Sequence, residues 1–572
     1  MRRYTFLFLI YLLVFSTPMV ALDQPLAHAE RLYVITDKPT YIAGESLWGA
    51  VFCVDAQTRQ FSNLSSVAYV ELCDAQESVW QGKVALQQGR GSLILPLPSS
   101  LATGNYLLRA YTRYMQNEGE QVFFSRIVSI YNVLSTDKTE QTLVDTTRRA
   151  ATVMAPAVES PLLALSVPLE ATPRSPLALK LQNLGSEAAH FTVSVYAKDA
   201  LDAAQNPCLA DYLRTMPQGF LHSNAYIADY EGEIVYAKVL SSQDGKPVYP
   251  GEQAKAYLSV VGHPAQVVEG QIDAQGNIRF FTSGIYGVRD AATELFPLYN
   301  RSCQVVLQDA FVSYTPQNLP SLRLYPDTKA DLQYRSLSMQ LGHHFFADTL
   351  HHPKPTSPFP WLTGHSVTYV LNDYTRFPVM RELFIEFISE ARVRQQAGRN
   401  TFIVRPFDGF GRFFSHEEKA LVLLDGIPVF DHDRMLNFDP LLIERITVYD
   451  GFYNLGGTTH CGVIDFKTYK KDLGGMSFPE NLRITSFNGL QYPLRFTSPE
   501  YEPGGRARDP RFETVPDWRH TLYWKADACL EAGAREEITC YTSDYKGNFV
   551  VVLEGMTSSG KAFRQIANFK VQ

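Results

Sequence analysis

The sequence has few charged residues and no run of basic residues. Charged side chains make up 19% of the 572 residues, and the formal net charge is −7. Nucleic-acid recognition needs a basic face. The composition therefore predicts no binding to nucleic acid or to a similar polyanion. A hydrophobic content of 45% also excludes a disordered chain.

The sequence lacks the short motifs of common hydrolase and redox chemistry. It contains no Gly-x-Ser-x-Gly and no Cys-x-x-Cys, and His416-Glu-Glu418 lacks the second histidine of HExxH. His460 and Cys461 are adjacent, and neighbours on a strand point to opposite faces, so they would not meet. The sequence predicts no enzyme and no cofactor.

Two segments contain metal-ligating residue types without a complete ligand pattern. His343-His344 and His351-His352 lie close together, but no Glu or Cys lies among them, and a solvated loop is the simpler interpretation. Asp431-His-Asp433 matches only a fragment of a calcium-binding loop. No metal ligand is therefore predicted.

The first residues have the pattern of an export signal. Arg2 and Arg3 precede an apolar run over 6–15, and the small residue Ala21 follows. This run is shorter than the ~20 apolar residues of a membrane span, and no other segment reaches that length. We expect a signal peptide over 1–21, no intrinsic span after its removal, and a mature chain in the periplasm or associated with the outer membrane.

Seven cysteines in an exported chain permit disulfides, although an odd number leaves at least one thiol free. Cys529 and Cys540 flank Glu531-Ala-Gly533, an expected hairpin turn, and opposite residues of a hairpin come within ~5.5 Å. Cys53 and Cys73 are a second candidate pair, on strands expected to be neighbours. The alternative is that these cysteines are small buried hydrophobic residues.

Aromatic and turn-forming residues predict a mainly β chain. There are 31 Tyr, 35 Phe and 33 Pro, and the length predicts about three to five domains. Residues 31–135 contain Tyr33-Val-Ile-Thr-Asp-Lys-Pro-Thr-Tyr-Ile-Ala-Gly-Glu45 and Gly104-Asn-Tyr-Leu-Leu-Arg-Ala110. This block resembles the second macroglobulin-type domain of the alpha-2-macroglobulin family, a β-sandwich. The family's Gly-Cys-Gly-Glu-Gln thioester is absent from the sequence, so the resemblance does not imply covalent trapping of proteases.

Further β blocks follow the first. Residues 136–161 are expected to be a linker and 162–228 a second macroglobulin-like sandwich. Residues 229–320 resemble the carboxypeptidase-regulatory-like β-sandwich through Gly232–Val239 and Asp273–Phe281. Residues 321–378 are expected to be an irregular or β connection, and 471–572 a C-terminal β-sandwich.

Residues 379–470 have the most specific pattern. Val379–Arg394 has apolar residues at helical spacing, and Asp425-Gly426 suits a tight turn with positive φ. Ala420–Val429, Asp439–Gly451 and Gly462–Thr468 follow in the order that resembles the plug domain of TonB-dependent outer-membrane receptors. Too few residues follow Lys470 for the 22-stranded barrel of such a receptor. We therefore expect an α+β plug-like domain without a barrel in this chain.

The order of the blocks resembles a group of Bacteroidetes envelope proteins. The predicted fold is mainly β: tandem macroglobulin/Ig-like sandwiches, one plug-like α+β domain and a C-terminal sandwich. Three functions stay open. The first is a non-catalytic envelope scaffold whose plug-like domain binds another envelope protein. The second is a component of a transport or secretion complex, in which that domain gates an outer-membrane barrel made by another chain. The third is a protease-inhibitor relative.

A plug-like surface that no barrel covers in the same chain is expected to bind a partner. Six residues on loops beside the expected plug-like strands are candidates for that contact: Phe430, Asp431, Asp433, Arg434, Phe452 and Tyr453. The alternative is that the terminal sandwich and the helix over 379–394 bury this surface.

Overall fold

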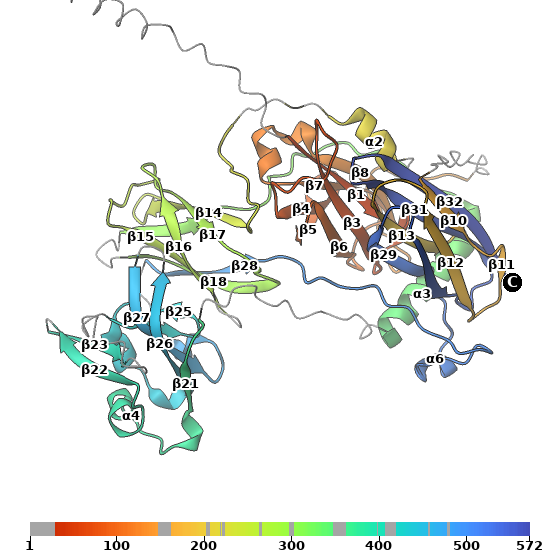
Figure 1. Cartoon of the computed structure of the whole chain (residues 1–572). Helices are drawn as coiled ribbons and strands as arrows, with labels where there is room; N and C mark the ends of the chain where they lie inside the picture. Colours follow the sequence, from red (N-terminus) through yellow and green to blue (C-terminus); the bar gives the residue numbers. More distant parts are fainter. Residues whose placement is uncertain are drawn as a thin grey trace, which may run out of the picture.

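A computed structural model describes residues 29–146, 162–201, 206–217, 219, 223–261, 266–296, 302–346, 362–396, 398–405, 419–455, 458–477 and 481–572 (Figure 1). Its strands form several separate sheets, which confirms the predicted mainly β fold. The signal peptide over 1–21 lies outside the described residues. Across the ranges above, no helix has the length and apolarity needed to cross a membrane.

The first block is a two-sheet sandwich with a core of large apolar residues. One sheet has the order β1-β3-β6 and the other β2-β8-β7-β4-β5. The strands are β1 (Glu30–Thr36), β2 (Thr40–Ile42), β3 (Ser46–Asp55), β4 (Val67–Cys73), β5 (Ser78–Ala85), β6 (Arg90–Pro96), β7 (Gly104–Tyr111) and β8 (Phe124–Tyr131). The 3-10 helices η1 (Tyr114–Asn117) and η2 (Glu120–Val122) connect the last two.

A second sandwich combines two segments that are far apart in the sequence. Its sheets have the orders β10-β12-β30 and β11-β32-β31-β13-β29. The strands are β10 (Leu163–Ser166), β11 (Glu170–Ala171), β12 (Pro176–Asn183), β13 (Ala189–Ala197), β29 (Thr521–Leu530), β30 (Arg535–Tyr541), β31 (Gly547–Thr557) and β32 (Ala562–Val571). The expected separate sandwiches over 162–228 and 471–572 are thus one domain, because the strands near residue 180 pair only with C-terminal strands and with β10.

This arrangement also removes the basis of both proposed disulfides. β29 pairs with β13 and β30 pairs with β12, so Glu531–Gly533 connects two sheets and is not a hairpin turn. Cys53 on β3 and Cys73 on β4 likewise belong to different sheets. All seven cysteines are free thiols, and most are buried, as the alternative interpretation expected.

The third block is a single seven-stranded sheet that curves around its own core. Its order is β19-β14-β17-β16-β15-β18-β28, and the last strand comes from the C-terminal part of the chain. The strands are β14 (Ile234–Ser241), β15 (Lys255–Val260), β16 (Gln266–Ile272), β17 (Asn277–Phe281), β18 (Val288–Phe296), β19 (Cys303–Leu307) and β28 (Arg483–Asn488).

The longest helix of the described residues lies where a connection was expected. α3 spans Lys329–Phe346, after η3 (Pro326–Thr328), within the segment 321–378. It joins the first two sandwiches: Nε of Arg335 donates to Asp199 Oδ2 at 2.5 Å, and Nη1 donates to the carbonyl of Thr40 at 2.8 Å. Directly before η3, β20 (Leu322–Leu324) pairs in parallel with β9 (Thr142–Val144). β9 lies inside 136–161, which was expected to be a linker. The short helices α2 (Leu209–Thr215) and α6 (Arg511–Thr514) complete this half.

The segment whose sequence resembles a plug domain, called the plug-like domain from here on, folds as an α+β unit. Its first strand begins at Ser366, before the expected start at residue 379. Its sheet has the order β21-β26-β27-β24-β25, and a separate hairpin pairs β22 with β23. The strands are β21 (Ser366–Val370), β22 (Ala391–Gln396), β23 (Arg399–Val404), β24 (Leu421–Leu424), β25 (Ile427–Pro428), β26 (Ile443–Leu455) and β27 (Thr458–Thr468). Its helices are η5 (Leu371–Asp373), α4 (Met380–Glu386), α5 (His432–Leu436), η7 (Pro440–Leu442) and η8 (Leu473–Gly475).

Two predictions inside this unit had opposite outcomes. Asp425 and Gly426 have φ of 51° and 93°, so the predicted tight turn with positive φ is confirmed. The helix predicted over 379–394 is too long: α4 ends at Glu386, and a strand begins at Ala391. Val393 packs against the core while its two neighbours face outward, and pairing with β23 fixes this period of two.

Candidate functional site

The plug-like domain is attached to the third block by one end of its sheet. Nζ of Lys255 on β15 donates to Oγ1 of Thr458 at 2.6 Å. The ring of Phe430 lies between Tyr257 and Phe296, with centroid distances of 4.9 and 4.8 Å. Figure 1 shows the upper ends of β26 and β27 beside β16 and β18. The chain therefore covers this part of the plug-like surface itself.

Buried apolar side chains extend the contact beyond Phe430. One cluster joins Tyr257 and Val267 of the third block to five residues of the plug-like sheet: Leu421, Leu423, Tyr453, Leu455 and Val463. The hydroxyl of Tyr453 donates to the carbonyl of Thr363 at 2.7 Å. Phe430 and Tyr453, expected to contact a partner, contact the same chain. The third block covers this surface, whereas the alternative interpretation assigned that role to the terminal sandwich and the helix over 379–394.

The other four candidates have separate roles in the domain. Asp431 caps α5 by accepting from the backbone N–H of Asp433. Asp433 accepts from Nδ2 of Asn400 at 2.6 Å, which ties α5 to the β22–β23 hairpin. Nε of Arg434 lies 3.9 Å from Oδ2 of Asp431. Phe452 is 49% exposed and is the only strongly exposed apolar residue of the six.

Glu294 is a buried acid within the attached end. It lies on β18 opposite Tyr257, and its side chain therefore points to the same face as Phe296. It is 6% exposed. Burial raises its pKa to about 8, and the charge of Arg434 opposes that rise. The contact between the two domains thus contains a carboxyl that is largely protonated near neutral pH.

The opposite end of the plug-like sheet exposes apolar side chains. β26 has 13 residues, which at ~3.3 Å each spans about 40 Å. Residues near its start and near the ends of β21 and β27 form what we call the distal patch: Val370, Tyr374, Leu441, Leu442 and Tyr469. Each has two-fifths or more of its surface exposed. The patch lies at the end of the sheet away from the contact with the third block.

Arg376 connects the parts of the distal patch. Its Nη2 donates to the carbonyl of Pro440 at 2.8 Å, and its Nη1 lies 3.2 Å from the carbonyl of Ile443 and 3.3 Å from the hydroxyl of Tyr469. That hydroxyl donates to Oδ1 of Asn372 at 2.6 Å. These hydrogen bonds fix Tyr469 and the backbone beside Leu441 and Leu442 relative to one another.

Sequence reasoning missed the distal patch because exposure depends on tertiary packing. The paired leucines Leu441-Leu442 follow Pro440 directly before β26, and two adjacent leucines there were the only sequence signal. Two further aliphatic side chains are exposed nearby: Ile385 on α4 is 70% exposed, and Val379 directly before α4 is 48% exposed.

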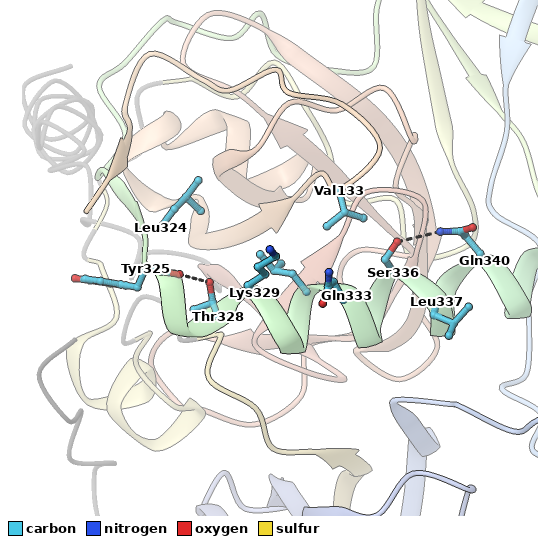
Figure 2. Close-up of a pocket in the computed structure, with 10 residues that line it drawn as sticks. Val133, Leu324, Tyr325, Thr328, Lys329, Gln333, Ser336, Leu337 and Gln340 are labelled. Atoms are coloured by element: carbon cyan, nitrogen blue, oxygen red, sulfur yellow. Dashed lines mark hydrogen bonds between the residues drawn. The ribbon is translucent and has the colours of Figure 1, made fainter. Parts of the chain in front are cut away.

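The cavities in the described residues give weaker indications of a ligand. A groove of about 440 Å³ runs along α3 below Val133 and Leu324 (Figure 2). Its hydroxyls are satisfied locally: Thr328 donates to the carbonyl of Tyr325 at 2.7 Å, and Gln340 donates to Ser336 at 3.0 Å. This groove therefore offers no convergent set of polar groups.

A second cavity, of about 290 Å³, lies where α3 meets the first sandwich and the segment before β29. Lys38 lines it and is already held by Asp37 at 3.3 Å and Glu45 at 3.4 Å. His520 also lines it and is 3% exposed, and burial lowers its pKa well below the usual value. Asp37 accepts from Oγ1 of Thr521 at 3.1 Å, so the Tyr33–Glu45 motif serves to join the two sandwiches.

Of the four histidines that were considered as metal ligands and interpreted as a solvated loop, two can be placed, and they lie on a helix. His343 and His344 lie in the last turn of α3, and His343 contacts the carbonyl of Gly44. His351 and His352 lie outside the described residues. Metal binding by this segment stays untested.

No protein-family model matches the sequence, and no curated protein matches it at a significant level. Among solved structures, trypsin-activated alpha-2-macroglobulin from Escherichia coli is 9% identical, with 95% of this chain and 42% of that chain covered, at a TM-score of 0.24. The native conformation of the E. coli protein is 10% identical, with 96% of this chain and 40% of that chain covered, at a TM-score of 0.24. The E. coli adhesin FdeC is 11% identical, with 47% of this chain and 60% of that chain covered, at a TM-score of 0.14.

This chain spans about two-fifths of the length of the macroglobulin structures. At TM-scores this low, the overlaps carry no argument about fold or function. The candidate site therefore rests on its own geometry.

Proposed function

We propose that this protein is a non-catalytic interaction protein of the cell envelope, whose plug-like domain binds another protein through the distal patch. The observation that carries the proposal is the difference between the two ends of the plug-like sheet. One end of its sheet is fixed to the third block, and the other end presents apolar side chains to solvent. Several exposed apolar side chains at one end of a domain are typical of an interaction site.

Buried contacts between the first sandwich and the third block support a role of the other domains in positioning the plug-like domain. Lys83 of the first sandwich pairs with Glu233 of the third block at 2.5 Å, and both side chains are buried. Nη2 of Arg109 donates to the carbonyl of Val312 at 2.6 Å across the same junction. Such contacts hold the plug-like domain at a fixed distance from the first two sandwiches.

The test compares two double variants of the full chain in capture from detergent-solubilised native envelope. Leu441→Ser with Leu442→Ser removes two leucines of the distal patch. Leu169→Ser with Leu184→Ser removes two exposed leucines of the second sandwich and is the matched control. We expect the patch variant to retain at most about a tenth of the partner, since a few central apolar residues dominate an interface.

Equal capture by both variants and by the wild type would refute the proposal. Circular dichroism and melting of each purified variant must first show an intact fold. The identity of the captured partner separates the open alternatives: an outer-membrane channel protein would favour the gating role, and a soluble partner the scaffold role.

A further inference from the structure

β21 is an edge strand of the plug-like sheet, and the described residues leave its outer edge open. It comes first in the order β21-β26-β27-β24-β25, and within the described ranges it pairs only with β26. Its sequence, Ser-Val-Thr-Tyr-Val, contains no charge and no proline, and its register with β26 has no bulge. Charges, prolines, bulges or covering segments normally protect an edge strand from pairing with another chain. β21 therefore lacks the usual protection against such pairing in the part of the chain that the structure describes.

The hydrogen bonds to β26 show which backbone groups of β21 point outward. The N–H of Asp450 donates to the carbonyl of His365 at 3.2 Å, and the register makes these two residues direct opposites. Opposite residues of antiparallel strands alternate between pairs that exchange backbone hydrogen bonds and pairs that exchange none. Starting from His365, every second residue thus bonds to β26. The residues between them direct their N–H and C=O groups away from the sheet: Ser366, Thr368 and Val370.

Two observations support this assignment. The Oγ1 atoms of Thr368 and of Thr447 on β26 lie 3.0 Å apart, which fits the closer spacing of a pair without backbone hydrogen bonds. Among the described residues, none donates to or accepts from the outward backbone groups of Ser366, Thr368 and Val370. All three residues are exposed. The edge therefore offers alternating donors and acceptors to a further strand.

The outward groups are arranged symmetrically about Thr368, which favours a second copy of the same strand. With a two-fold axis at Thr368, its backbone bonds to Thr368 of the other copy, and that of Ser366 bonds to Val370 of the other copy. Every outward N–H and C=O group of both strands is then paired. We propose that the chain forms a two-fold dimer in which β21 pairs with β21 of a second copy, so that two plug-like sheets become one.

The side chains that this dimer brings together match each other. Thr368 faces Thr368 of the other copy, and Val367 faces Tyr369 of the other copy. Threonine pairs, and pairs of an aromatic with a β-branched residue, are among the favourable cross-strand pairs. A charge at the centre of the strand would face its own copy and repel it, and β21 has none. These matched pairs assign the edge to a second copy and not to an unrelated peptide.

The two-fold axis also separates the bodies of the two copies. Ser366 pairs with Tyr449, towards the end of β26 that contacts the third block, and Val370 pairs with Arg445, away from it. Antiparallel pairing of the two β21 strands therefore places the third blocks at opposite ends of the joined sheet. The dimer goes beyond the proposed function, because it concerns the edge of the sheet and a second copy; Val370 belongs to both surfaces.

The test is sedimentation equilibrium of the full chain between about 2 and about 200 µM, because an interface of this size is weak. We expect a monomer–dimer equilibrium within this range. Thr368→Lys and Thr368→Glu each place like charges opposite one another, and each should raise the dissociation constant at least about fivefold. An equimolar mixture of the two should form a mixed dimer within about twofold of the wild-type affinity, because lysine then faces glutamate. About 0.5 M NaCl should reduce this recovery.

Ser486→Lys and Ser486→Glu are the matched controls. Ser486 is exposed on β28, the edge strand of the third block, and its substitution should leave the dissociation constant unchanged. Hydrogen exchange of the wild type gives a readout that needs no variant. The outward amides of Ser366, Thr368 and Val370 should be protected only at high protein concentration, whereas the amides that bond to β26 should be protected at low concentration too.

Several results would overturn the proposal. One is a wild-type chain that stays monomeric at about 200 µM, with outward amides that exchange equally at all concentrations. Others are wild-type affinity in both Thr368 variants, a mixture that associates no better than either variant alone, or an equal loss in the Ser486 variants. The dimer is measured without any envelope partner, so its failure leaves the proposed function standing, and failed capture of a partner leaves the dimer standing.

Discussion

Replacing Glu294 by Gln should stabilise the attachment of the plug-like domain at alkaline pH. Glu294 lies in the contact between the third block and the plug-like domain, with Tyr257 and Phe296 around it. Its carboxyl has a pKa of about 8 in the folded chain, against an ordinary value of 4.5. Glutamine has nearly the same shape and stays neutral at every pH.

The sign follows from proton binding. Between about pH 4.5 and about pH 8 the folded chain holds a proton on Glu294 that the unfolded chain has lost, so the free energy of unfolding falls as pH rises. Integrating this difference from about pH 5 to about pH 8 gives a loss on the order of 3–4 kcal/mol. Glu294→Gln should lack this loss, and Arg434→Gln should enlarge it, because Arg434 is the nearby cation that favours the carboxylate.

The measurement is calorimetric unfolding of the full chain across this pH range, with hydrogen exchange at β26 and β18 to report on the contact. Glu386→Gln is the control, because Glu386 is exposed on α4. The reasoning fails if wild type and Glu294→Gln show parallel pH profiles, or if the control changes the profile as much as Glu294→Gln does.

Other parts of the chain give further predictions. Arg335→Met should leave Asp199 buried without its cation and lower the free energy of unfolding by about 3–5 kcal/mol. Hydrogen exchange and proteolysis around α3 should become faster, and unchanged protection there would contradict this. Burial lowers the pKa of His432 to about 4, so stability should fall by up to ~3 kcal/mol as pH drops from about 6.5 to about 4; a His432→Gln variant with the same acid profile would exclude this cause. Alkylation of the native chain should modify exposed Cys529 first and buried Cys540 only on unfolding, and a peptide map showing them bridged would disprove the strand assignment.

The local sequence determined many of the strands, turns and core-facing residues of this protein. Asp425-Gly426 adopts positive φ because an Asp-Gly pair tolerates that conformation better than most residues. In β12, Leu177, Leu179 and Leu181 alternate with outward residues and enter the core, as a period of two requires. These features depend on neighbours in the chain and could be predicted from them.

Tertiary structure decided which strands pair and which surfaces remain exposed. A strand's periodicity shows which side chains are buried but not which strand lies beside it, and β13 pairs with β29 and β31 more than 300 residues away. The position at which α4 ends likewise depends on the pairing of β22 with β23, because residues 391–396 are held in a strand by that pairing. Phe430 and Tyr453 were expected on a free surface, but packing against the third block buries Tyr453 and encloses the ring of Phe430, and only the folded chain determines that contact.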